Sequence, residues 1–142
     1  MIAVCDTGPL VAAVNRRDND HEVCRAALSG YPGVLIVPVT VAVEVDYLLR
    51  ARVSPEAARA FLADVDSGAF TLDSVGSDVF RRAVEIDARY ANAGIGFVDA
   101  SVVAVTEHRR ASVVFSLDHA DLRLALPAQV ELAPSPADLG PR

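Results

Sequence analysis

The sequence predicts an α/β fold, a three-layer α/β/α sandwich in which a mostly parallel sheet of four to five strands lies between helices. Short apolar runs such as residues 2–5 and 34–37 are typical of strands that are buried on both faces. Segments with apolar residues at helical spacing separate these runs, and strands that alternate with helices favour parallel pairing. With 142 residues, 52% of them hydrophobic, the chain can bury one core. We therefore expect a single domain over residues 1–133 and a Pro-rich tail at 134–142.

The first half of the chain carries start and stop signals at its predicted helix boundaries. Pro9 stands in the first turn of a helix, where its missing N–H is not needed. Gly30 ends a second helix before a Tyr-Pro-Gly turn, and Ser54 is a favourable N-cap for a later helix. The predicted elements are a strand at 2–5, a helix from Thr7, a helix that ends near Gly30, a strand at 34–37, a helix at 39–52 and a helix after Ser54.

The second half continues the alternation of strands and helices. Gly94 and Gly96 interrupt a long stretch of helical spacing and divide it into two helices. The residues after 133 show no periodicity. The predicted elements are a strand at 69–75, helices at 77–92 and 97–110, a strand at 112–117, a short helix at 119–125 and an edge strand at 130–132.

The composition excludes several classes of protein. All 13 basic residues are arginine, and both a nucleotide-binding P-loop and Schiff-base chemistry require lysine. Cys5 and Cys24 show neither a disulfide pattern nor metal-ligand spacing. No apolar run approaches the roughly 20 residues of a membrane-spanning helix, and no signal-peptide pattern opens the sequence. We expect a soluble cytoplasmic protein.

Four acids stand where a soluble domain is expected to be apolar. Asp6 and Asp118 directly follow predicted strands, and Glu44 and Asp99 lie among apolar residues of predicted helices. Because the carboxyl ends of parallel strands meet at one edge of a sheet, Asp6 and Asp118 should lie close together. Each acid also has an ordinary explanation as a helix cap, a turn residue or the partner of an arginine. A divalent cation is the simplest way to keep four converging carboxylates charged.

The type of these ligands favours Mg²⁺ or Mn²⁺, because hard cations take oxygen ligands whereas zinc prefers histidine and cysteine. The three histidines show no metal-ligand spacing. Such a cation activates water and neutralises charge on a phosphodiester, which indicates metal-dependent phosphodiester hydrolysis. The formal net charge of −6 argues against a phosphate-rich partner, but the four acids contribute most of it, so this argument is weak.

Four short motifs contain these acids. They are Asp6-Thr7 after the first strand, Glu44-Val45-x-Tyr47-Leu48-Leu49 within a helix, Phe97-Val98-Asp99-Ala100-Ser101 at a helix start, and Ser116-Leu117-Asp118 at the end of a strand. In their order and spacing they resemble the motifs of PIN-domain nucleases, and specifically those of the VapC-type toxins of toxin–antitoxin pairs. The resemblance covers most of residues 1–132.

The resemblance implies a PIN-like sandwich and a function. The chain would be an endoribonuclease toxin that cuts cellular RNA, is silenced by a cognate antitoxin protein and forms a homodimer. Two alternatives stay open: a catalytically inactive PIN-like module that binds RNA or protein, and another metal-dependent phosphoesterase. The implied site has Asp6 and Asp99 as direct Mg²⁺ or Mn²⁺ ligands, Glu44 and Asp118 acting through water, and Thr7 and Ser116 as supporting hydroxyls.

Residues 119–122 depart from the toxin pattern. The toxins usually carry a basic and aromatic segment after the last acid, whereas this chain has His-Ala-Asp-Leu. Arg16, Arg17 and His21 follow the first predicted helix and are candidates for contacts with substrate phosphates. Interleaved acids largely cancel their charge, so a solvated loop is an equal alternative.

Apolar residues on two adjacent predicted helices could form an exposed groove for a partner. Core packing would also explain most of them. By resemblance to the toxins, an antitoxin peptide or a second subunit would lie over these helices. The residues concerned are Tyr47, Leu49, Val53 and Phe61.

Overall fold

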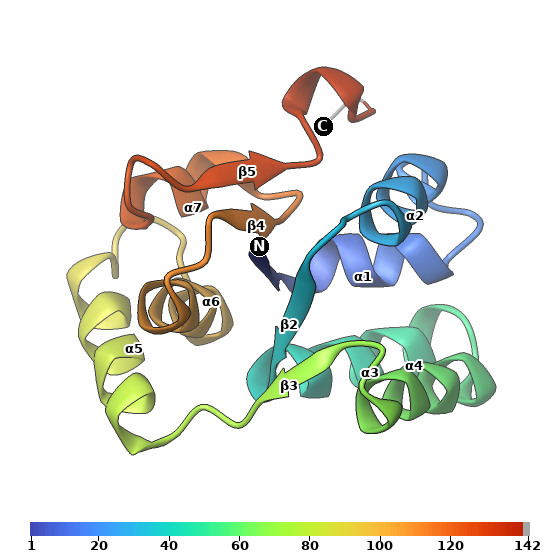
Figure 1. The fold of residues 1–142 in the computed structure, drawn as a ribbon, viewed down its shortest axis with the longest axis horizontal. Helices are drawn as coiled ribbons and strands as arrows, with labels where there is room; N and C mark the ends of the chain where they lie inside the picture. The colour runs from blue at the N-terminus through green and yellow to red at the C-terminus, as the bar shows by residue number, and fades with distance from the viewer. Residues whose placement is uncertain (141–142) are drawn as a thin grey trace.

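A computed structural model describes residues 1–140 and shows one five-stranded sheet in the order β3-β2-β1-β4-β5 (Figure 1). Every neighbouring pair of strands is parallel. The predicted α/β class and mostly parallel sheet are confirmed. The strands are β1 (Ile2–Cys5), β2 (Val34–Pro38), β3 (Thr71–Asp73), β4 (Val113–Phe115) and β5 (Glu131–Ala133).

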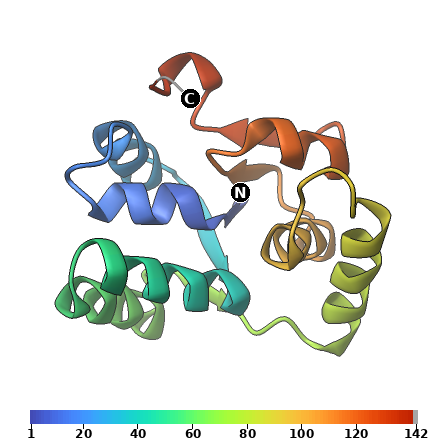
Figure 2. The same ribbon diagram turned by 180° about the vertical axis from the view of Figure 1, so that it is seen from behind.

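Helices connect the strands and cover the sheet. Figures 1 and 2 both place α1 to α4 on one side of the central strands and α5 and α6 on the other. In the described part of the chain, no helix has the length and apolar character needed to cross a membrane. The helices are α1 (Thr7–Val14), α2 (His21–Ser29), α3 (Val39–Arg52), α4 (Pro55–Ser67), α5 (Ser77–Arg89), α6 (Phe97–Arg109) and α7 (His119–Ala125), with a 3₁₀ turn at Pro136–Asp138.

The central strand β1 is apolar because helices cover both of its faces. Ala3 pairs with Leu35 of β2 on one side and with Val113 of β4 on the other, and Ala3 to Cys5 are fully buried. Helix α6 is buried along its length from Ala100 to Thr106, since it packs between β1 and α5. The core therefore fixes the carboxyl end of β1 against the start of α6.

Three elements are clearly shorter than their predicted ranges: the strand predicted at 112–117 covers only Val113–Phe115, and two others end early for reasons that the structure shows. The strand predicted at 69–75 covers only Thr71–Asp73, because the Asp73 carboxylate accepts the Val75 N–H at 2.8 Å and Val75 turns to a φ of 54°. The helix predicted at 77–92 ends at Arg89, several residues before Gly94 adopts its φ of 78°. Both differences arise where side-chain capping and turns end an element before its apolar pattern does.

The predicted apolar groove is wrong for two of its residues. Leu49 and Phe61 are buried in the core, where Phe61 packs against Phe70 with ring centroids 5.9 Å apart. Tyr47 and Val53 are exposed. Phe61 therefore packs α4 against the core.

The structure describes the residues after β5 as far as Gly140. Pro134 is buried, and the Gly140 N–H donates to Asp20 Oδ1 at 2.7 Å. This hydrogen bond ties the tail to the start of α2. The division into a domain at 1–133 and a tail at 134–142 stays a prediction, and residues 141–142 lie outside the described part of the chain.

Candidate active site

Asp6 lies at the carboxyl end of β1 and is buried. Its Oδ1 accepts the Thr7 N–H at 2.8 Å, so Asp6 caps α1, and its Oδ2 accepts the Ser116 hydroxyl at 2.9 Å. The Ser116 Oγ also accepts the Asp118 N–H at 2.9 Å. Asp6, Ser116 and Asp118 therefore form one hydrogen-bonded chain across the ends of β1 and β4, as parallel strands require. The helix-cap role of Asp6 is thus compatible with its place in the acid cluster.

Glu44 on α3 and Asp99 in the first turn of α6 are both partly buried. A hydrogen bond near them joins these helices: Ser101 Oγ donates to the Val98 carbonyl at 2.6 Å, so its lone pair accepts the Thr40 hydroxyl, also at 2.6 Å. This contact holds the start of α3 against the start of α6. The chain positions four acids with elements that are far apart in sequence.

The four acids act on one another electrostatically. Burial raises the pKa of Asp99 to about 7, with further contributions from the carboxylates of Asp6, Asp118 and Glu44. Burial also raises the pKa of Asp6, against the lowering effect of its hydrogen bonds from Thr7 and Ser116. Mutual repulsion of this kind requires the carboxylates to occupy one region. The structure therefore places the four predicted acids within electrostatic range of one another.

The donor set fits a hard divalent cation in its chemistry, since every candidate ligand is an oxygen. The buried Thr7 hydroxyl has no hydrogen-bond partner among the described residues, so it retains a free oxygen beside Asp6. The carboxylates do not form a closed cage, however: within residues 1–140, no three His, Cys, Asp or Glu side chains are close enough together to hold an ion. A cation at this site would have to draw the acids inward.

Asp121 is an acid of this site that the sequence prediction missed. Its carboxylate raises the pKa of both Asp99 and Asp118, although burial is the larger cause for each. A Cβ placed on Gly94 would lie 3.5 Å from Asp121 Oδ2, so the loop before α6 borders this side chain. The signal in the sequence was the spacing from Asp118, three residues earlier, across the first turn of α7.

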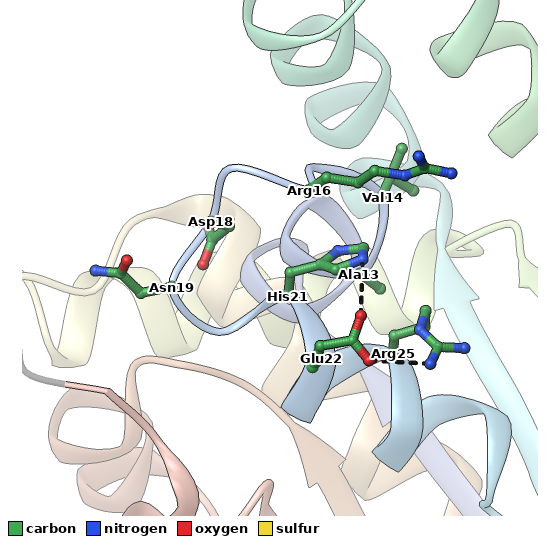
Figure 3. A pocket seen from close by; sticks show the side chains of 8 residues that line it. All are labelled: Ala13, Val14, Arg16, Asp18, Asn19, His21, Glu22 and Arg25. Carbon is green, nitrogen blue, oxygen red and sulfur yellow. Dashed lines mark hydrogen bonds and ion pairs between the residues drawn. The ribbon is translucent and has the colours of Figure 1, made fainter.

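The structure separates the candidate substrate-binding residues from the acids. Asp6 caps the start of α1, whereas Arg16, Arg17 and His21 follow its end, about 12 Å further along the helix axis. Arg16 and His21 line a cleft of about 750 Å³ there (Figure 3).

Figure 3 shows how the charges in this cleft are arranged. The His21 Nδ1–H donates to the Ala12 carbonyl at 2.8 Å, which leaves Nε2 3.5 Å from Glu22. Glu22 in turn pairs with Arg25 at 3.0 Å. The cleft thus contains both signs of charge. Contact of Arg16, Arg17 and His21 with substrate phosphates stays a prediction.

A parallel sheet with acids gathered at its carboxyl edge places the chain among the α/β proteins whose site lies at that edge. The chain belongs to the PIN domain family, whose model matches residues 3–125. The resemblance predicted from the four motifs is thereby confirmed at the level of the family.

A curated relative extends the match. The chain is 29% identical over 115 residues to Ribonuclease VapC26 of Mycobacterium tuberculosis, which covers 81% of this chain and 85% of the relative. The two sequences therefore align over nearly the whole domain.

Solved structures share the fold. The crystal structure of Mycobacterium tuberculosis VapC20, a toxin that cleaves the sarcin–ricin loop, superposes with a TM-score of 0.81 at 24% identity, over 88% of this chain and 96% of that one. A toxin–antitoxin complex from Klebsiella pneumoniae gives a TM-score of 0.69 at 17% identity, and the match covers 93% of this chain and 96% of that one. VapBC2 from Rickettsia felis, bound to a promoter DNA fragment, gives a TM-score of 0.67 at 15% identity, and the match covers 92% of this chain and 97% of that one.

Proposed function

We propose that this PIN-domain protein is a metal-dependent endoribonuclease that acts as the toxin of a toxin–antitoxin pair. The aligned relative is named a ribonuclease, and the VapC20 structure is described as a toxin that cleaves the sarcin–ricin loop. The observation that carries the proposal is the convergence of Asp6, Glu44, Asp99 and Asp118 from four separate elements. Their mutual repulsion is a cost that a structural role does not explain and a bound cation would offset.

In this proposal Asp6 and Asp99 hold Mg²⁺ or Mn²⁺ directly, and Glu44 and Asp118 act through water. The cation, when bound, supplies positive charge at the phosphodiester and makes water a better nucleophile. Thr7 and Ser116 hold the Asp6 carboxylate in one orientation. Binding an ion would therefore cost this side chain little further conformational entropy.

The hydroxyls support the acids rather than the reaction itself. Ser116 donates to Asp6 and positions the Asp118 backbone, which keeps two acids at a fixed separation. The free hydroxyl of Thr7 lies beside Asp6 and would donate to a carboxylate or a water in the loaded site. The role of both hydroxyls in this proposal is to orient the carboxylates of the site.

The partners follow from the same assignment. The structure from Klebsiella pneumoniae is a toxin–antitoxin complex, which supports a cognate antitoxin for this chain. A homodimer would cover exposed apolar side chains of α3 and α5, such as Val43 and Val84. Action on cellular RNA would take place in the cytoplasm.

Digestion of RNA by the purified protein tests the proposal. We expect cleavage with Mg²⁺ or Mn²⁺, none after EDTA, and recovery when the metal is restored. Asp6→Asn and Asp99→Asn should each abolish cleavage while the circular dichroism spectrum stays native. Comparison with DNA and mononucleotide substrates separates a ribonuclease from another phosphoesterase.

The open arrangement of the acids favours one alternative, a PIN-like module that binds RNA or protein without cutting. Such a module would bind RNA equally well with and without metal and would give no products at any metal concentration. Cleavage that depends on Asp6 would exclude it.

A further inference from the structure

The turn between β4 and α7 contains Asp118 and begins at Ser116. Every polar atom of Ser116 has a partner. Its N–H donates to the Ala133 carbonyl at 2.8 Å, and its hydroxyl contacts both Asp6 and Asp118 at 2.9 Å. Its carbonyl accepts a hydrogen bond from His119 Nε2 at 2.8 Å. His119 therefore completes the set of bonds that fixes Ser116 in place.

The sheet does not supply a donor for this carbonyl. Phe115 and Ala133 are the last residues that pair between β4 and β5, and Ser116 lies just beyond them. Within residues 1–140, no backbone N–H donates to the Ser116 carbonyl. Because Ser116 is fully buried, leaving this carbonyl unpaired would be costly. The imidazole of His119 thus provides the donor that the sheet lacks.

The hydrogen bond also identifies the ring nitrogen that acts. A carbonyl oxygen only accepts, so His119 Nε2 must carry a proton whether the ring is neutral or charged. The ring is partly buried and turns back toward Ser116. The basic residue that directly follows Asp118 is therefore bound to its own turn, and its Nε2 is not free to contact a substrate phosphate.

Two acids depend on the position of Ser116. Its hydroxyl donates to Asp6 and accepts the Asp118 N–H, so a shift of the Ser116 backbone would move both acids. His119 is the first residue of α7, and its bond to Ser116 closes the turn around Asp118. Replacing a residue that orients metal ligands in this indirect way typically lowers metal affinity or activity about 10–100-fold.

We propose that His119 is a positioning residue of the acid site, which holds the Ser116 carbonyl so that Asp6 and Asp118 keep the arrangement in which they bind a divalent cation. This inference rests on the proposed metal-dependent function and adds a residue that acts through Ser116. The role requires the Nε2–H donor, and it requires neither the charge nor the aromatic character of the ring.

Three replacements separate this donor from the rest of the side chain. The amide nitrogen of glutamine lies as many bonds from Cα as Nε2 does in histidine, so His119→Gln keeps the donor in place. The amide nitrogen of asparagine corresponds to Nδ1 instead, so His119→Asn keeps an amide without the bond. His119→Leu keeps apolar bulk and has no donor. His108→Leu, at an exposed histidine near the end of α6, is the matched control.

Calorimetric titration with Mn²⁺ gives the first readout. Wild type, His119→Gln and His108→Leu should bind Mn²⁺ within about twofold of each other, and His119→Leu and His119→Asn about tenfold more weakly. Binding of an RNA oligonucleotide in EDTA should stay within about twofold for all variants, because the bond to Ser116 involves no substrate. Urea unfolding identifies conditions in which every variant is folded, and the titrations are compared there, so a loss of stability alone would not change the affinities.

Cleavage kinetics at saturating Mn²⁺ give the second readout. His119→Leu should lower kcat about tenfold without changing KM for RNA, and His119→Gln should restore kcat. Equal Mn²⁺ affinity and kcat for wild type and His119→Leu would overturn the inference and leave the ribonuclease proposal standing. Equal losses in His119→Gln and His119→Leu would also overturn it, because the ring would then matter rather than the donor. Weaker RNA binding by His119→Leu in EDTA would assign the ring to the substrate instead.

The wild type separates this inference from the proposed function. If it binds Mn²⁺ without cutting RNA, the ribonuclease proposal is wrong, and the Mn²⁺ affinities of the variants still decide the role of His119. If it neither binds Mn²⁺ nor cuts RNA, both proposals are overturned.

Discussion

The Ser116 hydroxyl donates a hydrogen bond of 2.9 Å to the buried Asp6 carboxylate, across 110 residues of sequence. The same oxygen accepts the Asp118 N–H, so one small side chain joins two acids at the ends of neighbouring strands. Such a bond can form only when β1 and β4 are parallel and adjacent. The site is thus a direct product of the strand order.

Ser116→Ala should destabilise the protein by about 1–3 kcal/mol, because a buried carboxylate oxygen loses its donor. Cleavage should also fall, since Asp6 is then free to rotate. Ser112→Ala is the matched control, because Ser112 is exposed in the same β4 region. Urea unfolding of the three proteins measures the difference, and equal midpoints for Ser116→Ala and Ser112→Ala would show that the bond contributes nothing.

The metal-free protein should lose stability as the pH rises from about 4 to about 7. The folded-state pKa of Asp99 is about 7, above its ordinary value of 3.8, so the folded protein retains a proton that the unfolded chain has released. After allowance for solvent screening, the loss should be about 1–2 kcal/mol. Asp6, whose pKa burial also raises, acts in the same direction.

Urea unfolding in EDTA at pH 5 and pH 8 measures this loss. Asp99→Asn removes the titrating group and should make the stability at the two pH values more nearly equal. A wild-type protein that is equally or more stable at pH 8 would contradict the electrostatic description of the site.

Asp121→Asn should lower the pKa of Asp99 and Asp118, because a nearby negative charge is removed. The acidic limb of the pH–rate profile should therefore move to lower pH while the fold is retained. Asp138→Asn, an exposed acid in the tail, serves as the control. An unchanged profile for Asp121→Asn would place this residue outside the site.

The ion pair between Asp73 and Arg109 should matter more than the surface pairs. Arg109 Nε donates to the buried Asp73 carboxylate at 2.8 Å, and the same carboxylate caps Val75. Arg109→Ala should cost about 1–3 kcal/mol of stability, whereas Arg81→Ala, in an exposed pair at 3.3 Å, should change it little. Thermal unfolding compares them, and equal effects would show that burial of Asp73 is unimportant.

The sequence predicts the site better than it predicts the surface. Asp6 and Asp118 could be placed together because each follows an apolar strand, and Glu44 and Asp99 because apolar residues flank them at helical spacing. The sequence did not predict Asp121 as a site residue, because this residue lies in a short polar stretch with no periodicity. Its part in the site depends on how α7 packs beside the loop that contains Gly94.

Burial on helices α3 and α4 could not be assigned from spacing alone. Leu49 and Tyr47 are two positions apart and differ completely in exposure, because the sheet and α4 cover only one side of α3. The sequence likewise could not predict the distance between Arg16 and the acids, since this distance depends on the direction in which α1 leaves the edge of the sheet.

Calorimetric titration of the purified protein with Mn²⁺ at pH 7.5 tests the central claim most directly, because it measures whether the converging acids bind an ion. Wild type should give a saturable binding heat and a higher melting temperature with metal. Asp6→Asn and Asp99→Asn should lose both effects, while Asp138→Asn keeps them. No binding heat and no change in melting temperature for the wild type would contradict the account.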